Sequence, residues 1–211
     1  VVSANVSGRD QKSAVDEIRR IINEKIALPE GYHIEYGGQF EAEAEASRTL
    51  LLMSMLSLLI IFLLLFQEFK NVKISGIILL NLPLALIGGV FSIYFTSGIL
   101  SIPAIIGFIT LFGVATRNGI LLVTHYKTLQ EEGLSLYDTI IQGSKDRLSP
   151  ILMTALTAGL ALIPLALAGD LPGNEIQSPM AKVILGGLLT STLLNIFIVP
   201  VVYFLSNSKP E

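Results

Sequence analysis

The chain has 211 residues, of which 52% are hydrophobic and 15% are charged, and its formal net charge is −3. Soluble globular domains carry about 25% charged residues, so much of this chain is expected to face a medium other than water. The acidic balance argues against a nucleic-acid-binding protein, which would be basic. The sequence has no cysteine, which excludes disulfides, thiolate metal sites and a cysteine nucleophile.

The polar residues 1–38 are predicted to form an incomplete β-α-β piece of a folded domain. Alternating apolar residues in 2–6 and 32–36 predict two strands, and apolar residues at helical spacing predict a helix between them. So short a piece cannot bury both faces of a sheet by itself. It therefore needs strands that this sequence does not contain.

Long uncharged stretches begin after Arg48, among them Thr49–Gln67 and the 43 residues from Ile74 to Thr116. A bilayer core about 30 Å thick requires roughly 20 apolar residues in a helix. We therefore expect residues 39–211 to be a mostly α-helical membrane domain with an amphipathic linker helix at about 134–148. The five predicted spans lie at about 49–67, 74–95, 100–126, 151–169 and 181–205.

The distribution of basic residues predicts the orientation of these spans. Lysine and arginine occur in the loop after the first span, in the loop after the third span and in the C-terminal tail, whereas residues 96–99 and 170–180 have none. The positive-inside rule places the basic loops and the C-terminus in the cytoplasm. With five spans, the N-terminal segment lies on the opposite side, which in a bacterial inner membrane is the periplasm.

Arg117 is the one charged residue deep within a predicted span. It lies about nine residues, or roughly 14 Å, from the expected helix end near Tyr126. A charge near the bilayer centre costs about 2.5–3.5 kcal/mol, so Arg117 is expected to face a protein interior and an acidic partner. No Asp or Glu of this sequence is deep enough, so the partner must come from elsewhere. A proton or ion relay and a structural salt bridge both remain possible interpretations.

Two runs of sequence resemble the resistance-nodulation-division (RND) efflux pumps. They are Gly113-Val114-Ala115-Thr116-Arg117-Asn118-Gly119-Ile120-Leu121-Leu122-Val123 and Arg147-Leu148-Ser149-Pro150-Ile151-Leu152-Met153-Thr154. The N-terminal runs Val6–Asp10, Leu28–Tyr32 and Tyr36–Glu41 are similar to the heavy-metal cation exporters of that family. The resemblance covers essentially the whole chain and implies spans eight to twelve of a twelve-span pump, preceded by the end of a periplasmic pore-domain subdomain.

The resemblance further implies a proton-driven secondary transporter with no cofactor and no resident metal in this region. Arg117 would be the cationic member of a proton relay, with Asn118 beside it and Thr154 lining it, and the relay's aspartates would lie outside this sequence. Many drug-exporting members have lysine at the position of Arg117, whereas a guanidinium does not deprotonate in proteins. The implied partners are the N-terminal half of the same pump, a homotrimeric assembly, a periplasmic adaptor and an outer-membrane channel.

Three alternatives remain beside the export of heavy-metal cations. An RND pump for drugs or other organic compounds and a related protein-export or lipid-transport subunit both share the relay and the span pattern. An intramembrane protease is a third class, but it needs a Ser/His pair or paired Asp residues inside the spans. The predicted spans contain no Asp, and His125 lies at the end of its helix.

Overall fold

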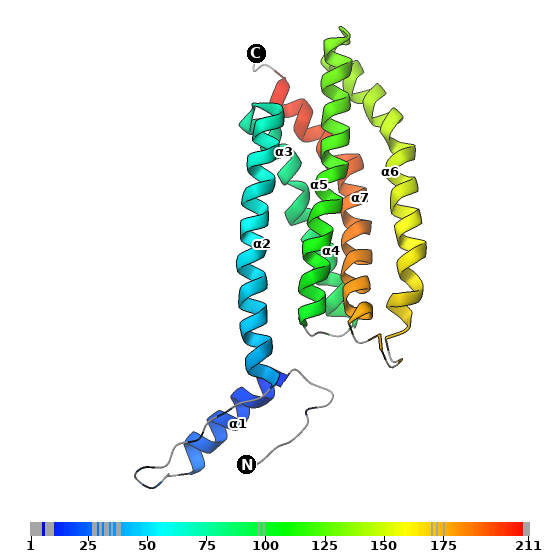
Figure 1. The fold of residues 1–211 in the computed structure, drawn as a ribbon. Helices are drawn as coiled ribbons and strands as arrows, with labels where there is room; N and C mark the ends of the chain where they lie inside the picture. The colour runs from blue at the N-terminus through cyan, green and yellow to red at the C-terminus, as the bar shows by residue number, and fades with distance from the viewer. Residues whose placement is uncertain are drawn as a thin grey trace. The chain divides into compact units, whose positions relative to one another are not determined.

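The structure is a computed structural model, and it describes residues 6, 11–26, 29, 31, 34, 36, 39–96, 98, 100–169, 171, 173–174 and 176–208. The chain divides into two compact units, Val1–Leu52 and Met53–Glu211. Figure 1 shows the helices, coloured in chain order. Their bounds are α1 Gln11–Lys25, α2 Gln39–Phe69, α3 Val72–Leu79, α4 Asn81–Thr96, α5 Ile102–Glu131, α6 Leu136–Leu167 and α7 Gln177–Asn207.

The first unit contains α1, which is the helix expected between the two N-terminal strands. No strand occurs among the residues that the structure describes, and most residues of the expected strands at 2–6 and 32–36 lie outside that part. The guanidinium carbon of Arg19 lies 4.8 Å from the centroid of the Tyr36 ring, so a cation–π contact joins Tyr36 to α1.

The mostly α-helical membrane fold with five spanning helices is confirmed. Within the described residues, five helical stretches are long and apolar enough to cross a membrane. The predicted spans at 49–67 and 181–205 each fall within one helix, and the span at 100–126 begins two residues before α5. The second and fourth predicted spans differ more in their helix boundaries. The stretches are Glu45–Phe69, Val72–Thr96, Ile102–Glu131, Leu136–Leu167 and Gln177–Asn207.

The second predicted span is divided into two helices, α3 and α4, which meet at Leu80. Pro83 lies in the first turn of α4, so it has no amide hydrogen to donate to the carbonyl of Leu79 at the end of α3. Asn71 begins α3, because its side-chain oxygen accepts from the backbone amides of Lys73 and Ile74 at 2.9 and 3.4 Å. The break places Asn81, fully buried, at the start of α4.

The linker helix expected at 134–148 and the span expected at 151–169 form one continuous helix, α6. Proline often ends a helix, but both Pro150 and Pro164 lie inside α6. A proline removes one backbone hydrogen bond, and the surrounding turns keep the helix intact. Gly133 adopts a φ of 95° in the connection, and the hydroxyl of Ser135 accepts from the amide of Asp138 at 3.2 Å to begin α6.

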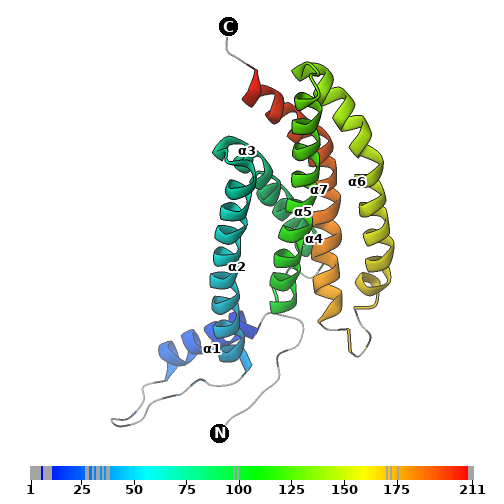
Figure 2. The ribbon, with the colours of Figure 1, turned by 45° about the horizontal axis from the view of Figure 1, so that its top comes forward.

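The core of the second unit lies where α4, α5 and α7 pack together (Figures 1 and 2). Gly88 of α4 and Gly186 of α7 allow a close approach, because a Cβ at either position would collide with the other helix. One apolar cluster includes Leu82, Ala85, Leu111, Phe112 and Ala115. A second cluster includes Ile78, Leu122, Val123, Tyr126, Val199 and Tyr203.

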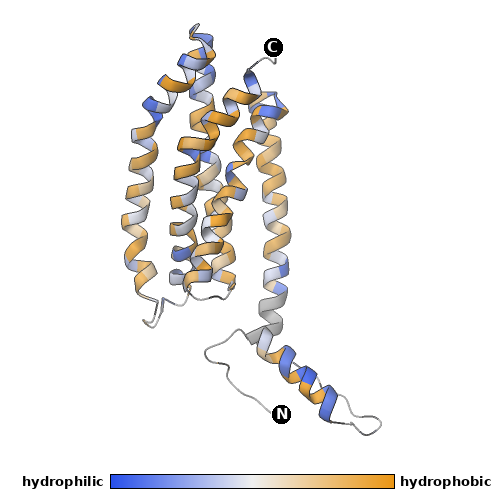
Figure 3. Cartoon of the chain, turned by 180° about the vertical axis from the view of Figure 1, so that it is seen from behind, coloured by the Kyte–Doolittle hydropathy of each residue, from blue (hydrophilic) through white to orange (hydrophobic). Residues whose placement is uncertain are grey.

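The helices α2 and α6 expose most of their apolar surface. In the most apolar 18-residue stretch of each, only 6% of the residues are buried, against 39–50% in the other spans. Figure 3 shows that hydrophobic residues predominate along the spanning helices. The exposed apolar surfaces of α2 and α6 are available to lipid or to other helices.

Candidate functional site

A cavity of about 250 Å³ lies between α5 and α6 and contains the three residues predicted for the relay. Its lining combines cationic, amide and hydroxyl side chains with an apolar wall. The lining residues are Arg117, Asn118, Leu121 and Leu122 of α5 and Arg147, Pro150, Ile151 and Thr154 of α6. The structure therefore brings together Arg117 and Asn118 of α5 with Thr154 of α6, which are more than 35 residues apart in the sequence.

Arg117 lies in the middle of α5 and its side chain is exposed on the surface of this chain at the cavity. Among the described residues, the ion pairs are His125–Asp146 and Lys127–Glu131, and neither includes Arg117. The guanidinium is permanently charged and offers five N–H donors. It can therefore bind a carboxylate that approaches from outside this chain.

Arg147 adds a second guanidinium to the same cavity. It is half-buried, and its Nε atom is buried without a hydrogen-bond partner in the described part of the chain. The positive potentials of the two guanidiniums add within one cavity, which favours the binding of an anion there. No carboxylate contributes to the cavity lining.

Asn118 and Thr154 differ in how their polar groups are used. The Nδ2 group of Asn118 is buried without a partner within the described residues, and the side chain is only 3% exposed. The hydroxyl of Thr154 donates to the carbonyl of Pro150 at 2.9 Å, so its oxygen remains available only as an acceptor. The cavity thus combines guanidinium groups from both helices with an acceptor hydroxyl from α6.

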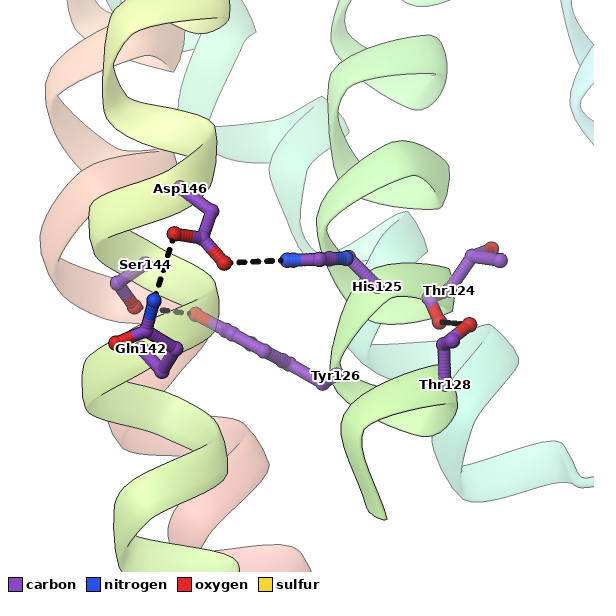
Figure 4. Close-up of polar contacts among 7 residues, drawn as sticks. All are labelled: Thr124, His125, Tyr126, Thr128, Gln142, Ser144 and Asp146. Carbon is purple, nitrogen blue, oxygen red and sulfur yellow. Dashed lines mark hydrogen bonds and ion pairs between the residues drawn. The ribbon is translucent and has the colours of Figure 1, made fainter. Parts of the chain in front are cut away.

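Polar contacts join α5 and α6 on the turns beyond the cavity (Figure 4). The Nε2 atom of His125 lies 3.0 Å from Oδ2 of Asp146, and the amide of Gln142 donates to Oδ1 of Asp146 at 2.9 Å. Tyr126 and Ser144 share a hydrogen bond of 2.6 Å between their hydroxyl oxygens. These contacts use both oxygens of the one carboxylate on the turn of α6 that contains Arg147.

The Tyr126 ring also connects this region to α7. Its centroid lies 5.0 Å from that of Tyr203, whose hydroxyl donates to Oε1 of Gln130 at 3.0 Å. Gly143 makes room for the Tyr126 ring, because a Cβ there would lie 2.6 Å from Cδ1 of Tyr126. Hydrogen bonds and ring contacts therefore join α5, α6 and α7 at this end of the bundle, in addition to apolar packing.

Two other features of the structure lack the polar groups of a binding site. A larger hollow of about 440 Å³ lies along α4, but its lining side chains Leu86, Ile87, Val90, Phe91 and Tyr94 expose no polar surface to it. Within the described residues there is also no group of three His, Cys, Asp or Glu side chains arranged to hold a metal ion. The α5–α6 cavity is the candidate site because charged and polar groups converge in it.

The sequence analysis used Arg147 only as a loop charge for orientation and as part of a family motif. Its place in the cavity follows from the continuity of α6 through Pro150, which places Arg147 and Thr154 two turns apart on one helix face. The seven-residue spacing of Arg147 and Thr154 is the sequence signal that would place both on one helix face. Pro150 between them argues against a continuous helix and so conceals that signal.

The five apolar helices, long enough to cross a membrane, and the polar cavity between two of them are features of a multi-pass membrane protein. The sequence model of the AcrB/AcrD/AcrF family, a group of RND transporters, matches residues 1–207. This match extends over nearly the whole chain. The chain belongs to that family.

Its relatives include proteins named for heavy-metal resistance. The cobalt-zinc-cadmium resistance protein CzcA of Cupriavidus metallidurans is 40% identical over all of this chain, which covers 20% of CzcA. Protein HelA of Legionella pneumophila is 42% identical over 99% of this chain and 20% of HelA. A crystal structure of a heavy metal efflux pump matches with a TM-score of 0.85 at 35% identity, over 97% of this chain and 20% of that chain. The chain thus spans about one fifth of the length of these relatives.

Proposed function

We propose that this chain is the C-terminal part of a proton-driven efflux pump that exports heavy-metal cations from a Gram-negative cell. Membership of the AcrB/AcrD/AcrF family supports transport, and relatives such as CzcA, named for cobalt, zinc and cadmium resistance, support metal cations as the substrate. The proposal assigns the metal to the whole pump as substrate, with the α5–α6 cavity as part of the energy-coupling site.

The observation that supports the coupling site most directly is the excess of donors in the cavity. The guanidinium side chains of Arg117 and Arg147 both line it, and no carboxylate contributes to its lining. A charge at mid-membrane costs about 2.5–3.5 kcal/mol unless it is compensated. Acidic side chains from the part of the pump outside this chain would supply that compensation and would themselves bind the proton.

Arg117, Asn118 and Thr154 then act as the fixed partners of a titrating carboxylate. When the carboxylate is ionised, Arg117 pairs with it, and when it is protonated the guanidinium turns away because the attraction is lost. The guanidinium keeps its charge throughout. Thr154 provides an acceptor oxygen for the protonated form of the carboxyl group, and Asn118 lies beside Arg117 in the cavity lining.

The proposal includes an orientation and an assembly. Residues 1–38 close a periplasmic pore-domain subdomain as a β-α-β piece completed by strands elsewhere in the pump, and residues 39–211 form the membrane domain. The basic loops support a cytoplasmic C-terminus, because lysine and arginine are enriched in cytoplasmic loops. The complete pump is a homotrimer joined to a periplasmic adaptor and an outer-membrane channel, as the family resemblance implies.

The test of the relay is proton-coupled transport by the full-length pump carrying Arg117→Ala. We expect transport to be lost at normal protein levels, whereas Arg117→Lys retains part of it because a cation remains. The matched control is Lys127→Ala, which removes an exposed cation of α5 that pairs with Glu131 at 4.0 Å outside the cavity. Full proton-coupled efflux by Arg117→Ala would refute the relay role.

The substrate is tested separately by comparing metal and drug sensitivity in cells that lack the complete gene. Increased sensitivity to divalent heavy-metal cations, restored by the full-length pump, is the expected result. Sensitivity confined to organic compounds would favour a drug exporter of the same family. Unchanged sensitivity to both, together with a defect in the envelope, would favour the protein-export or lipid-transport alternative.

A further inference from the structure

Three buried asparagines come from three different helices of the second unit. Asn81 begins α4, Asn118 lies at the middle of α5, and Asn195 lies in α7. Their exposed fractions are 0%, 3% and 0%. We call Asn81, Asn118 and Asn195 the asparagine layer.

The packing register places these residues at one level of the bundle. Leu111 of α5 contacts the Gly187 position of α7, and the Tyr126 ring of α5 contacts the Tyr203 ring of α7. Asn118 and Asn195 lie midway between those two contacts on their respective helices. A Cβ at Gly119 would lie 2.5 Å from Nδ2 of Asn81, so Asn81 reaches α5 beside Asn118.

The layer separates the two apolar clusters of the core. Leu82 and Leu111 belong to the cluster on one side, and Ile78 and Leu122 belong to the cluster on the other. Amide groups in such surroundings are normally hydrogen-bonded, because burial without a partner removes their bonds to water. Without hydrogen-bond partners, the layer would therefore lower the stability of an otherwise apolar core.

Four amide atoms of the layer have no hydrogen-bond partner within the described part of the chain. They are Nδ2 and Oδ1 of Asn81, Nδ2 of Asn118 and Oδ1 of Asn195. The remaining amide nitrogen of Asn195 donates to the carbonyl of Ser191 at 2.9 Å. Each of the four atoms is inaccessible from the surface of this chain, so side chains of the missing half of the pump cannot reach them without a rearrangement.

The hydroxyl of Thr116 on α5 is also buried without a hydrogen-bond partner among the described residues. The hydroxyls of Thr110 and Thr128 on α5 donate to the carbonyls four residues earlier, at 3.0 and 3.1 Å. The Thr116 hydroxyl, 6% exposed and one turn before Gly119, makes no such bond and has no other partner among the described residues. Its oxygen is thus free to bind a small polar molecule beside the layer.

The four amide atoms are two donors and two acceptors, so a molecule that binds all of them must both accept and donate hydrogen bonds. An anion would satisfy only the donors, and a cation would satisfy only the acceptors. Water donates two hydrogen bonds and accepts two, so it matches both kinds of atom. We propose that the asparagine layer holds ordered water in the centre of the bundle, beside the Arg117 cavity to which Asn118 also belongs.

This hydration site is tested in the full-length pump by X-ray hydroxyl-radical footprinting in ¹⁸O-labelled water. Radicals generated from an ordered internal water label the side chains beside it. We expect label on Ile78, which is 0% exposed and adjoins Asn81, and much less on Leu111, which is also 0% exposed but lies away from the layer. Equal background labelling of Ile78 and Leu111 would overturn the proposal, and this comparison requires no variant.

Two variants sharpen the result. Asn81→Leu and Asn195→Leu preserve side-chain size but remove the polar atoms, and we expect the ¹⁸O label on Ile78 to fall to the level of Leu111 in each. Thr139→Val is the matched control, because it removes a buried, unpartnered hydroxyl of α6 outside the layer and should leave the Ile78 label unchanged. Label on Ile78 that persists in both leucine variants would contradict the proposal. The readout does not depend on transport, so it stands apart from the test of the relay.

Discussion

His125 of α5 and Asp146 of α6 approach to 3.0 Å between Nε2 and Oδ2, and Asp146 immediately precedes the cavity-lining Arg147. This contact uses one oxygen of the Asp146 carboxylate, and the side-chain amide of Gln142 donates to the other. Asp146 is thereby held by partners other than Arg147, and the guanidinium remains available to the cavity.

The His125–Asp146 contact should contribute modestly to stability. The two side chains are 21% and 39% exposed, and partly exposed pairs of this kind contribute about 0.2–1 kcal/mol. A double-mutant cycle with His125→Ala and Asp146→Ala, followed by thermal unfolding of the full-length pump, should return a coupling energy in that range. The exchanged pair His125→Asp with Asp146→His should recover part of it, and a coupling of zero would show that the contact is not formed in the pump.

Arg117 and Arg147 should behave as one unit in transport. Since both guanidiniums line one cavity, removing either disturbs the same charge balance, and effects of residues in one site are not additive. We expect Arg147→Ala to reduce transport strongly and the double variant with Arg117→Ala to be no worse than the more severe single variant. Lys145→Ala, an exposed cation of α6 outside the cavity lining, serves as the control in initial-rate assays. Multiplicative losses in the double variant would indicate two independent sites.

Gly88→Ala should destabilise the α4–α7 contact. An added Cβ would collide with the side chain of Thr190 and the carbonyl oxygen of Gly186, and overpacking of this kind costs about 1–3 kcal/mol. The midpoint of thermal unfolding should fall accordingly. Gly76→Ala is the matched control, because nothing lies within 4 Å of its added Cβ and alanine favours a helix by about 1 kcal/mol over glycine. Equal midpoints for the two variants would argue against close packing of α4 and α7.

Asn71→Ala should weaken the start of α3. The Asn71 side chain accepts from the amides of Lys73 and Ile74, and loss of such a cap costs about 1 kcal/mol. Asn71→Asp keeps the acceptor and should retain most of the stability. Hydrogen exchange at the first amides of α3 measures the effect locally, and faster exchange is expected in the alanine variant only. Equal exchange rates in the alanine and aspartate variants would contradict the capping role.

Hydropathy and charge along the sequence were sufficient to predict the five spanning helices, because the demand for apolar surface in a bilayer acts on each segment separately. The same local pattern singled out Arg117 as a charge deep in a span. Proline was a less reliable guide, since Pro83 accompanies a break before α4 whereas Pro150 lies within an unbroken α6. Whether a helix continues through a proline depends on the turns and partners around it.

The sequence alone determined the class of protein, the number of spanning helices and the presence of a cation at the middle of one span, because each follows from the composition of a local segment. Only the tertiary structure placed Arg147 beside Arg117 and brought Asn81 to the level of Asn118 and Asn195. Those relations depend on the register and rotation of one helix against another. That register is set by contacts such as Gly88 with Gly186 and Tyr126 with Tyr203, which join residues far apart in the chain.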